Sequence, residues 1–342
     1  MNGTWQIDRP YTQEYGSATD RIHSVTVVLV GGRLDVVSQP GHGGVRCDVQ
    51  DVQGRPLTVS MMDGALRIEH HKESGGQLLD MLKGFLVNGR NATARVTLTV
   101  PTGTKVSVNT VGADVLVGGV DGEVSVNTVS GSVSLSRLGG RVDVKTVSSA
   151  IDASGLRGEL KSKSVSGGLT VDASALRSAK LGTVSGPILL DLAGSSGLVT
   201  ATGVSGDVTV RIPAGSGYDV TAGSQSGHVV VDGETLSGGS GSDKGGHRAE
   251  GDRAFAMKLR SVSGNVVVLR DGAESDHAAS PFVVSGDGQG DVQDLRPGAQ
   301  PGGQPGAQAG GAALWPESPA GSERTGGEQS GGGDRDGDAT GR

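Results

Sequence analysis

Amide and lysine side chains recur in this sequence at a regular interval, and they are the strongest candidates for binding chemistry. The candidate side chains are Asn109, Asn127, Lys145, Lys161, Lys163 and Lys180. Four of them are spaced 18 residues apart, so a chain that stacks with this period would place them in one column. Such a basic patch could hold an anion or a surface polymer. The simpler, competing interpretation is a solvated strand face.

Few other residues have a spacing that suits a chemical site. The seven histidines form no pair at metal-ligand spacing and Cys47 is the only cysteine, so we predict neither metal nor cofactor. The sequence has no phosphate-binding glycine loop and no Gly-x-Ser-x-Gly elbow. A β-helix enzyme that processes polysaccharides would need Asp143, Asp152, Glu159 and Asp172, but these are interleaved with Lys and Arg. We therefore expect a protein that is not an enzyme.

The elements that must position these side chains are short strands in a repeat. Units begin at Val106, Val124, Val142 and Leu160, always 18 residues apart, and later units lengthen to 19–21 residues. Each unit has two alternating apolar runs separated by Ser-Gly or Gly-Gly turns. A fixed period is typical of coils that bury their apolar faces against their neighbours. The sequence predicts an all-β fold, a β-solenoid or parallel β-helix-like stack over residues 105–270.

Two further patterns support in-register stacking. Glu123, Arg141, Glu159 and Arg177 alternate in sign at one repeat position, and this predicts a charge column that resists a slip by one coil. A Thr-Val-Ser-Gly signal recurs in nearly every unit. Its Ser and Gly are interpreted as turn residues rather than nucleophiles, because turns favour these residue types.

The regions outside the regular repeats are less uniform. Residues 1–104 are predicted to form an irregular N-terminal β region, with a hairpin at Gly31 and Gly32. Segment 76–88 has a helix-like apolar face and is predicted to cap an open end of the core. The alternative is a segment that touches a membrane or a partner, but interfacial helices usually carry more basic residues.

Charge and composition change along the chain of 342 residues. Residues 1–270 carry 26 basic and 25 acidic side chains, and this balance argues against a nucleic-acid partner. Residues 271–342 carry 4 basic and 12 acidic side chains, are rich in Gly and Pro and are predicted to be disordered. A Gly/Ser-rich loop insertion is expected at 234–252.

Several phrases of the sequence resemble a known bacterial family. They are TLTVPTGTKVSVNTVGADV (97–115), VSVNTVSGSVSL (124–135), VRIPAGSGYDVTAGSQSGHV (210–229) and KLRSVSGNVVV (258–268). They are similar to the putative-adhesin β-strand-repeat family, domain-of-unknown-function family 4097. The resemblance covers roughly residues 20–270 and implies a β-solenoid or β-helix-like fold. It supplies no catalytic or ligand-binding residues.

These observations lead to two principal hypotheses for function. The first is a non-enzymatic scaffold or protein-interaction module whose sheet faces bind a protein partner. The alternative is an adhesin-like binder of carbohydrate or cell-surface polymer, and the β-helix enzyme is a second alternative. The sequence has no basic segment followed by an apolar one at its start and no apolar run long enough to span a membrane. This predicts a cytoplasmic location.

Overall fold

The structure is a computed structural model that describes residues 3–17, 20–41, 43–70, 92–236 and 244–271. These residues form strands and no helix, so the all-β prediction is confirmed. The predicted cap segment 76–88 and the predicted disordered tail after residue 271 lie outside the described residues. In chain order the strands are β1 (Gly3–Ile7), β2 (Tyr11–Tyr15), β3 (Ser24–Ser38), β4 (Val45–Gln53), β5 (Leu57–Met62), β6 (Ala65–His70), β7 (Thr93–Val100), β8 (Lys105–Gly118), β9 (Val124–Thr128), β10 (Val133–Ser136), β11 (Arg141–Thr146), β12 (Ile151–Ser154), β13 (Arg157–Ser166), β14 (Leu169–Ser185), β15 (Ile188–Leu192), β16 (Gly197–Gly203), β17 (Val208–Ile212), β18 (Tyr218–Ser224), β19 (Val229–Val231), β20 (Glu234–Thr235), β21 (Lys244–Glu250), β22 (Phe255–Ser261) and β23 (Val266–Arg270).

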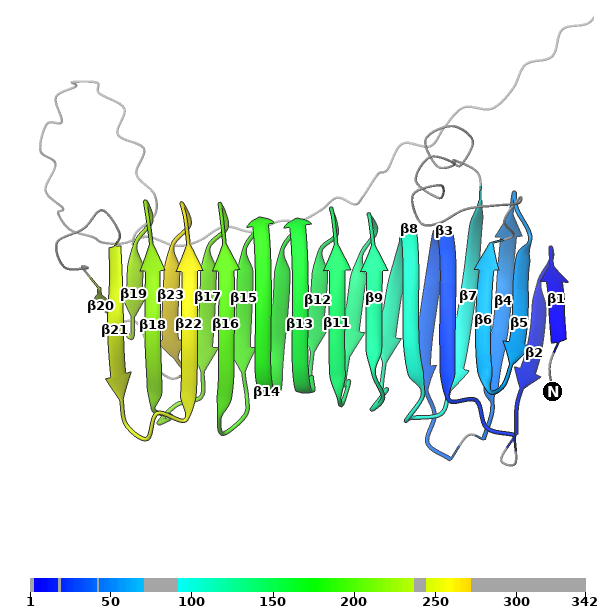
Figure 1. The fold of residues 1–342 in the computed structure, drawn as a ribbon, viewed down its shortest axis with the longest axis horizontal. Helices are drawn as coiled ribbons and strands as arrows, with labels where there is room; N and C mark the ends of the chain where they lie inside the picture. The colour runs from blue at the N-terminus through cyan, green and yellow to red at the C-terminus, as the bar shows by residue number, and fades with distance from the viewer. Residues whose placement is uncertain (1–2, 18–19, 42, 71–91, 237–243, 272–342) are drawn as a thin grey trace, which may run out of the picture. The chain divides into compact units, whose positions relative to one another are not determined.

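The strands form two layers, and the front layer faces the viewer in Figure 1. Within a layer, strands pair in parallel with strands of the next coil: β9 with β11 and β11 with β13 in front, β10 with β12 and β12 with β14 behind. The register is constant, because Val106 lies opposite Val124 and Val124 lies opposite Val142. The long strands β3, β8 and β14 contribute to both layers. The 18-residue period of the sequence is therefore the spacing between neighbouring coils.

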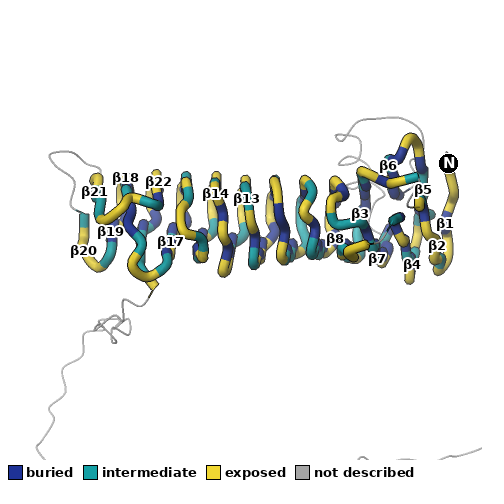
Figure 2. Tube along the Cα trace, turned by 90° about the horizontal axis from the view of Figure 1, so that it is seen from below, coloured by how far each residue is buried: buried dark blue, intermediate teal, exposed yellow. Residues whose placement is uncertain are grey.

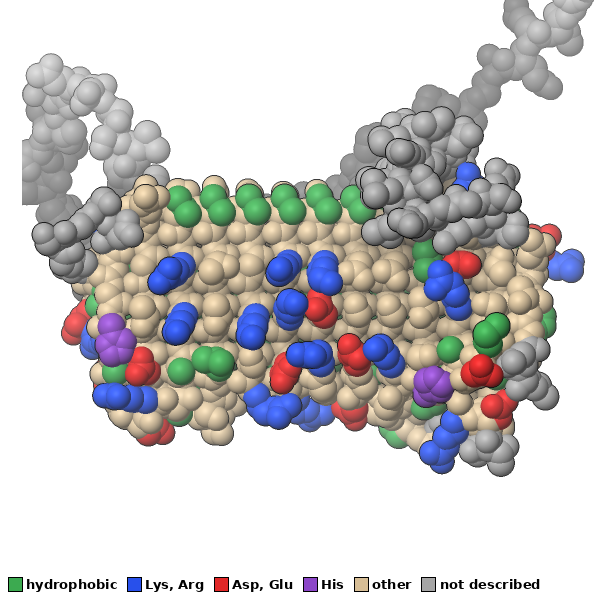
Figure 3. All heavy atoms as spheres, viewed as in Figure 1, with side chains coloured by type: hydrophobic (Ala, Val, Ile, Leu, Met, Phe, Trp, Pro, Cys, Tyr) green, Lys and Arg blue, Asp and Glu red, His purple; other side chains and the backbone are tan. Residues whose placement is uncertain are grey.

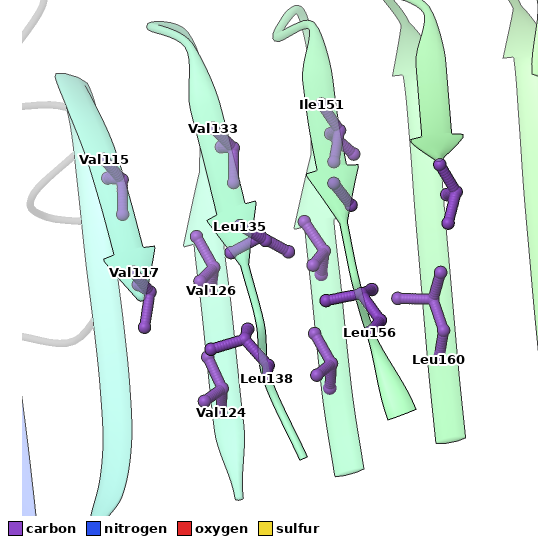
Figure 4. Packing of buried hydrophobic residues seen from close by; sticks show 14 of the residues in the cluster. Val115, Val117, Val124, Val126, Val133, Leu135, Leu138, Ile151, Leu156 and Leu160 are labelled. Atoms are coloured by element: carbon purple, nitrogen blue, oxygen red, sulfur yellow. The ribbon is translucent and has the colours of Figure 1, made fainter. Parts of the chain in front are cut away.

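The core lies between the two layers and consists mainly of Val, Leu, Ile and Ala. Val124 and Val126 enter it from the front layer, and Val133 and Leu135 enter it from the back layer (Figure 4). All four are at most 2 % exposed. Figure 2 shows the same alternation along the stack, with buried positions between exposed ones in every coil. Each fully buried side chain of this size contributes about 1.5–3 kcal/mol, so the sum over coils stabilises a fold with few aromatic residues.

The Thr-Val-Ser-Gly signal forms the corner where the chain passes from the front layer to the back layer. Thr128 is buried, and its hydroxyl donates a hydrogen bond of 2.7 Å to the carbonyl oxygen of Ser130. Gly131 has a φ of +97°, and a Cβ there would lie 2.4 Å from the carbonyl oxygen of Ala113 in the preceding coil. At Gly131 the preceding coil approaches too closely for a side chain, whereas the next coil has Ser149 at this position. The interpretation of Ser and Gly as turn residues is confirmed.

The predicted hairpin at Gly31 and Gly32 is wrong. β3 continues through both glycines and pairs in parallel with β8, first in the front layer and then in the back layer. Gly32 has a φ of +106°, and a Cβ there would lie 2.0 Å from the carbonyl oxygen of Ala94. The two glycines therefore turn the corner of a coil instead of reversing the chain, and local sequence does not distinguish these outcomes.

The predicted charge column needs one correction. Arg141 lies opposite Glu159 at 3.3 Å, as expected, and the column begins one coil earlier with Lys105 and Glu123 at 2.8 Å. Arg177, however, does not follow Glu159. A bulge between β13 and β14 shifts the register, so that Ser178 lies opposite Glu159 instead. The extra residue that lengthens this unit to 19 residues is absorbed here.

The coil formed by β22 and β23 is the last in the described sequence, but it does not lie at the end of the stack. β22 pairs with β16 on one side and β18 on the other, and β23 lies between β17 and β19 in the same way. The segment predicted as a loop insertion, 234–252, contains the strands β20 and β21. β20 pairs antiparallel with β19, and β21 pairs antiparallel with β18, because β18 and β19 offer an open edge. The polar sequence of β21 does not predict a strand at this edge.

Both ends of the stack change from parallel to antiparallel pairing. At the N-terminal end, β1 pairs with β5 and β5 with β6 in the front layer, and β2 pairs with β4 and β4 with β7 in the back layer. At the other end, β21 and β20 provide the antiparallel strands. The ends thus differ from the regular coils, as a terminal unit that must close an array should.

Candidate functional site

The predicted lysine patch lies on the outward face of the front layer, in two neighbouring columns. We call them the upper column and the lower column, the upper one being nearer the Thr-Val-Ser-Gly corners. The upper column contains Asn109, Asn127, Lys145, Lys163, Gly182, Thr202 and Arg260. The lower column contains Ser107, Ser125, Asp143, Lys161, Lys180, Thr200 and Lys258.

Strand geometry fixes the direction of these side chains. Successive residues of a strand point to opposite faces, so the buried Ser162 of β13 leaves Lys161 and Lys163 on the outer face. The parallel register then repeats the arrangement in neighbouring coils. Figure 3 shows the resulting rows of Lys and Arg side chains across the front of the stack. We use "basic surface" for the six cations of the two columns, which are Lys145, Lys161, Lys163, Lys180, Lys258 and Arg260.

The two predicted asparagines stand at the N-terminal end of the upper column and bind each other. The side-chain amide of Asn127 donates a hydrogen bond of 3.0 Å to the side-chain oxygen of Asn109, and both residues are half-buried. This hydrogen bond uses one side-chain N–H of Asn127 and the side-chain oxygen of Asn109 within the protein. These two residues therefore lock the register of β8 and β9 and offer fewer free polar groups than the lysines do.

The lysines differ in their ion pairs. Asp143 lies 3.7 Å from both Lys145 and Lys161, and it is the one acidic residue of the two columns. Lys163 and Lys180 have no carboxylate partner among the described residues, nor do the two cations contributed by β22. The charge of the basic surface is therefore only partly neutralised within the described part of the protein.

Lys258 and Arg260 belong to the basic surface, although neither was among the predicted residues. They lie opposite Thr200 and Thr202 because β22 pairs with β16. A signal was present in the sequence: Arg260 precedes Ser261 as Lys163 precedes Ser164, at the same phase of the repeat. The sequence did not predict that β22 lies between β16 and β18 in the stack.

A hollow of about 310 Å³ opens in the front face at the bulge between β13 and β14. Its polar lining consists of Arg141, Glu159, Lys161, Ser178 and Lys180. Three cations face one carboxylate, and the Ser178 hydroxyl adds a neutral hydrogen-bond donor. This composition suits a carboxylate, phosphate or sulfate group, which accepts charge-assisted hydrogen bonds from Lys and Arg.

A second hollow, of about 760 Å³, lies at the C-terminal end of the upper column. Gly223, Gly245 and Gly246 lack side chains and leave the backbone of β18 and β21 exposed to it, while Arg260 and Lys244 line its rim. The hollow is wide and open, and its cations continue the sign of the basic surface. It extends the surface on which an anionic partner would find hydrogen-bond donors.

The carboxylates considered for a polysaccharide-processing enzyme do not gather in one groove. Asp143 and Glu159 lie on the front layer, each beside a cation, whereas Asp152 and Asp172 lie on β12 and β14 in the back layer. Carboxylate pairs of glycoside hydrolases are separated by about 5–10 Å across one substrate. The two layers place these residues on opposite faces of the core.

His70 and Cys47 are two of the titratable side chains that are buried in the N-terminal coils. Burial lowers the pKa of His70 to about 4, with a smaller contribution from Arg55, and its Nδ1 accepts the backbone N–H of Val30 at 3.1 Å. Burial likewise raises the pKa of the Cys47 thiol to about 12. Both groups are held uncharged near neutral pH, so they are parts of the core.

The ranges of the chain that the structure describes show neither a cluster of metal ligands nor a membrane-spanning helix. Within these ranges no three His, Cys, Asp or Glu side chains lie together as metal ligands would. Nor does any helix in this part of the chain have the length and apolar character needed to cross a membrane.

Three solved structures that match this chain come from bacteria. A "putative lipid binding protein" from Parabacteroides distasonis ATCC 8503 is 13 % identical, with 76 % of this chain and 97 % of that one covered and a TM-score of 0.42. A "putative adhesin" from Bacteroides fragilis NCTC 9343 is 14 % identical, with 76 % and 97 % covered and a TM-score of 0.37. A "putative cell adhesion protein" from Clostridium sporogenes ATCC 15579 is 11 % identical, with 77 % and 100 % covered and a TM-score of 0.24.

A search of curated proteins gives no match. A family model, Toastrack DUF4097, matches residues 35–269, which include strands from both ends of the stack and all six cations of the basic surface. The match spans more than half of the chain and agrees with the family predicted from the repeated phrases. The chain belongs to the Toastrack DUF4097 family.

Proposed function

We propose that this protein is a non-enzymatic β-solenoid scaffold that binds an acidic protein partner through its basic surface. The observation that carries the proposal is the charge of the two outward front columns. They contain six cations and one carboxylate, held in fixed positions by the backbone register.

The physical argument concerns preorganisation. Each cation stands on a strand that is hydrogen-bonded on both sides, so its Cα does not have to be ordered when a partner binds. Fixed like charges on one face attract a partner of opposite sign and raise the association rate. Because exposed charges are screened within about 8–10 Å at moderate salt, affinity should fall as ionic strength rises.

A second candidate function is the binding of an anionic surface polymer. The observation that favours it is spacing: neighbouring coils place equivalent cations about 4.8 Å apart along the stack. The hollow beside Lys161 and Lys180 would receive one acidic group of such a polymer. A partner protein is preferred because the charges are grouped over a few coils and do not continue along the whole front layer.

The test compares two variants of the full chain that lose the same charge. One carries Lys163→Gln, Lys180→Gln and Lys258→Gln on the front layer, and the control carries Arg46→Gln, Arg95→Gln and Arg211→Gln on back-layer strands. We expect the front variant to bind fluorescent poly-L-glutamate at least tenfold more weakly than the control at 50 mM salt. Equal binding by the two variants would contradict the proposal.

If the protein binds a polyphosphate or an acidic polysaccharide but does not bind poly-L-glutamate, the result supports the second candidate, binding of an anionic surface polymer. Affinity capture from native cells with the same two variants then connects the surface to a real partner. A partner retained by the control and lost by the front variant is the supporting result.

A further inference from the structure

A row of exposed valines runs along the upper edge of the stack, at the Thr-Val-Ser-Gly-like corners of five consecutive coils. We call it the valine ridge, and its members are Val147, Val165, Val184, Val204 and Val262. Their exposed fractions are 43–49 %. Figure 3 shows a line of apolar side chains along this edge, above the cationic rows.

Hydrogen bonds between coils hold the ridge straight. The backbone N–H of Ser166 donates to the carbonyl of Val147 at 2.7 Å, and the N–H of Ser205 donates to that of Val184 at 2.9 Å. Ser263 donates in the same way to Val204 at 2.8 Å. The ridge therefore has the spacing of the coils, about 4.8 Å for each step and about 19 Å over four steps.

The fold explains why these side chains point outward but does not require them to be apolar. In four of the five coils the preceding residue is a Thr or Ser that points inward, and Gly203 precedes Val204, so the valine that follows faces solvent. In the coil of β18 this position is Gln225, which lies beyond Val262 in the stack. A polar residue is thus compatible with the corner, yet five consecutive coils expose valine.

The two flanks of the ridge differ in charge. On the front side, the upper column places Lys145, Lys163 and Arg260 two residues before the valines of their own coils. On the back side, the next residue in all five coils is an uncharged serine. A ligand that follows the ridge would meet cations along one flank only.

We propose that the valine ridge docks an amphipathic α-helix of a partner protein, with acidic side chains along one flank of the helix. This proposal rests on the proposed function, because three cations of the basic surface orient the helix. The helix supplies the apolar stripe, and its acidic flank meets Lys145, Lys163 and Arg260. The partner segment would be a helix of roughly 13 residues, because a helix of that length, at 1.5 Å per residue, is as long as the ridge.

Spacing favours a helix over an extended segment. Four turns of helix advance about 22 Å, close to the 19 Å of four coil steps. Four two-residue steps along one face of a strand advance about 27 Å and lose register with the valines. A helix is also about 10 Å across, so it can lie against the ridge and reach the upper column at the same time.

Size and residue type disfavour other occupants. A strip 19 Å long and 10 Å wide has about 200 Å² in projection, well below the roughly 800 Å² that each partner buries in a standard interface. A folded second copy would need more surface than this. Interfacial membrane segments use Trp, Phe and Leu, whereas the ridge is made of valine alone.

The test uses the full-length protein and labelled 16-residue helical peptides as probes. One peptide has a leucine stripe flanked on one side by Glu, the second has Lys in place of Glu, and the third is a scramble of the first. We expect the Glu peptide to bind at least tenfold more tightly than the other two in fluorescence anisotropy at 0.1 M salt.

The variants separate the ridge from the basic surface. Val165→Gln, Val184→Gln and Val204→Gln together copy the polar side chain found at Gln225 and should weaken binding of the Glu peptide at least tenfold. A matched control changes two exposed leucines away from the ridge, Leu189→Gln and Leu198→Gln, and should bind like the wild type. Thermal unfolding of all variants verifies that they are folded.

Poly-L-glutamate distinguishes failure of this inference from failure of the proposed function. The ridge variant should retain poly-L-glutamate binding. The basic-surface variant should bind poly-L-glutamate at least tenfold more weakly and the Glu peptide only moderately more weakly, because it keeps Lys145 and Arg260. Peptide binding that is insensitive to the ridge variant would overturn the helix assignment alone. Ridge-dependent binding to phosphatidylcholine vesicles containing phosphatidylglycerol, without peptide binding, would overturn it in favour of a membrane.

Discussion

The front and back faces of the stack differ in charge although the same coils build both. The upper and lower columns of the front layer contain six cations and one carboxylate, and a third outward front column holds Lys105, Glu123, Arg141 and Glu159, whose charges balance. The back-layer strands from β8 to β17 carry four outward aspartates and one outward basic residue. These residues are Asp114, Asp152, Asp172, Asp191 and Arg211.

The inward columns of the two layers are alike, because both supply Val, Leu and Ile to one core. Packing therefore determines the inward residues of both layers in the same way and constrains the outward residues less. On the back side, Asp114 accepts the backbone N–H of Ser132 at 2.8 Å, and Asp207, just before β17, accepts that of Asn265 at 2.7 Å, so these two acids also have a structural role. This contrast locates the candidate function on the front layer.

The largest expected effect comes from the core that both faces share. Leu135 enters it from the back layer and is 2 % exposed. Truncation by Leu135→Ala should lower the free energy of unfolding by about 2–5 kcal/mol, because it removes buried methyl groups and leaves a cavity. Chemical denaturation measures this loss. The outward neighbour Ser134→Ala is the control and should change stability by less than about 0.5 kcal/mol.

The free energy of unfolding should fall at acidic pH because of a histidine in the front layer. His70 on β6 has a pKa lowered to about 4 by burial, against an ordinary value of 6.5. The unfolded chain therefore binds a proton more readily, so stability is full above pH 6.5 and declines as the pH falls from 6.5 to 4. The loss approaches about 3 kcal/mol, at 1.36 kcal/mol for each pKa unit.

The variant His70→Phe should flatten this part of the stability curve, measured by urea unfolding between pH 4 and 7. Cys47 on β4 of the back layer is the comparison, because its pKa is raised to about 12 and it stays neutral throughout this range. Cys47→Ala should keep the slope of the wild type. A slope that persists in His70→Phe would assign it to other groups.

Charge reversal tests the faces directly. Lys163→Glu with Lys180→Glu should weaken binding of poly-L-glutamate about a hundredfold at 50 mM salt, since attraction becomes repulsion at the centre of the basic surface. The back-layer pair Arg46→Glu and Arg95→Glu changes the net charge by the same amount. It should weaken binding less than threefold in the same titration, and a comparable loss would mean that net charge alone determines binding.

The smallest effect concerns Asp143, the one acid of the upper and lower columns. Asp143 lies 3.7 Å from Lys145 and Lys161 and partly neutralises both. Asp143→Asn should tighten binding of the same probe about two- to fivefold, because exposed ion pairs contribute less than about 1 kcal/mol. Asp152→Asn on the back layer removes an equal charge and should leave affinity within twofold of the wild type.

Much of the regular region was predictable because each coil meets a nearly identical coil. Val106, Val124 and Val142 share one phase in the sequence and one column in the structure. The exceptions depend on contacts between distant segments. Whether Gly32 turns a corner or reverses the chain is decided by Ala94, and the exclusion of Arg177 is decided by how β14 pairs.

The candidate site follows the same division. Lys145, Lys161, Lys163 and Lys180 come together as their phases indicate, because parallel register converts phase into proximity. Lys258 shares the phase of Lys161, but its place beside β16 follows only from the insertion of the last coil. The repeat pattern places the valines of the ridge at turns but does not predict that they are exposed. Their exposure is known only from the structure.

The position of β22 and β23 also constrains how this protein can change its length in evolution. A repeat duplicated at the end of the array would have to follow β23, but β23 already lies between β17 and β19. The start of the array is closed in a similar manner, because β3 lies between β8 and the pair β6 and β7. Repeats can therefore be gained or lost only in the interior, between β8 and β17. Relatives with longer or shorter stacks should differ in that interval while both closing arrangements are inherited intact.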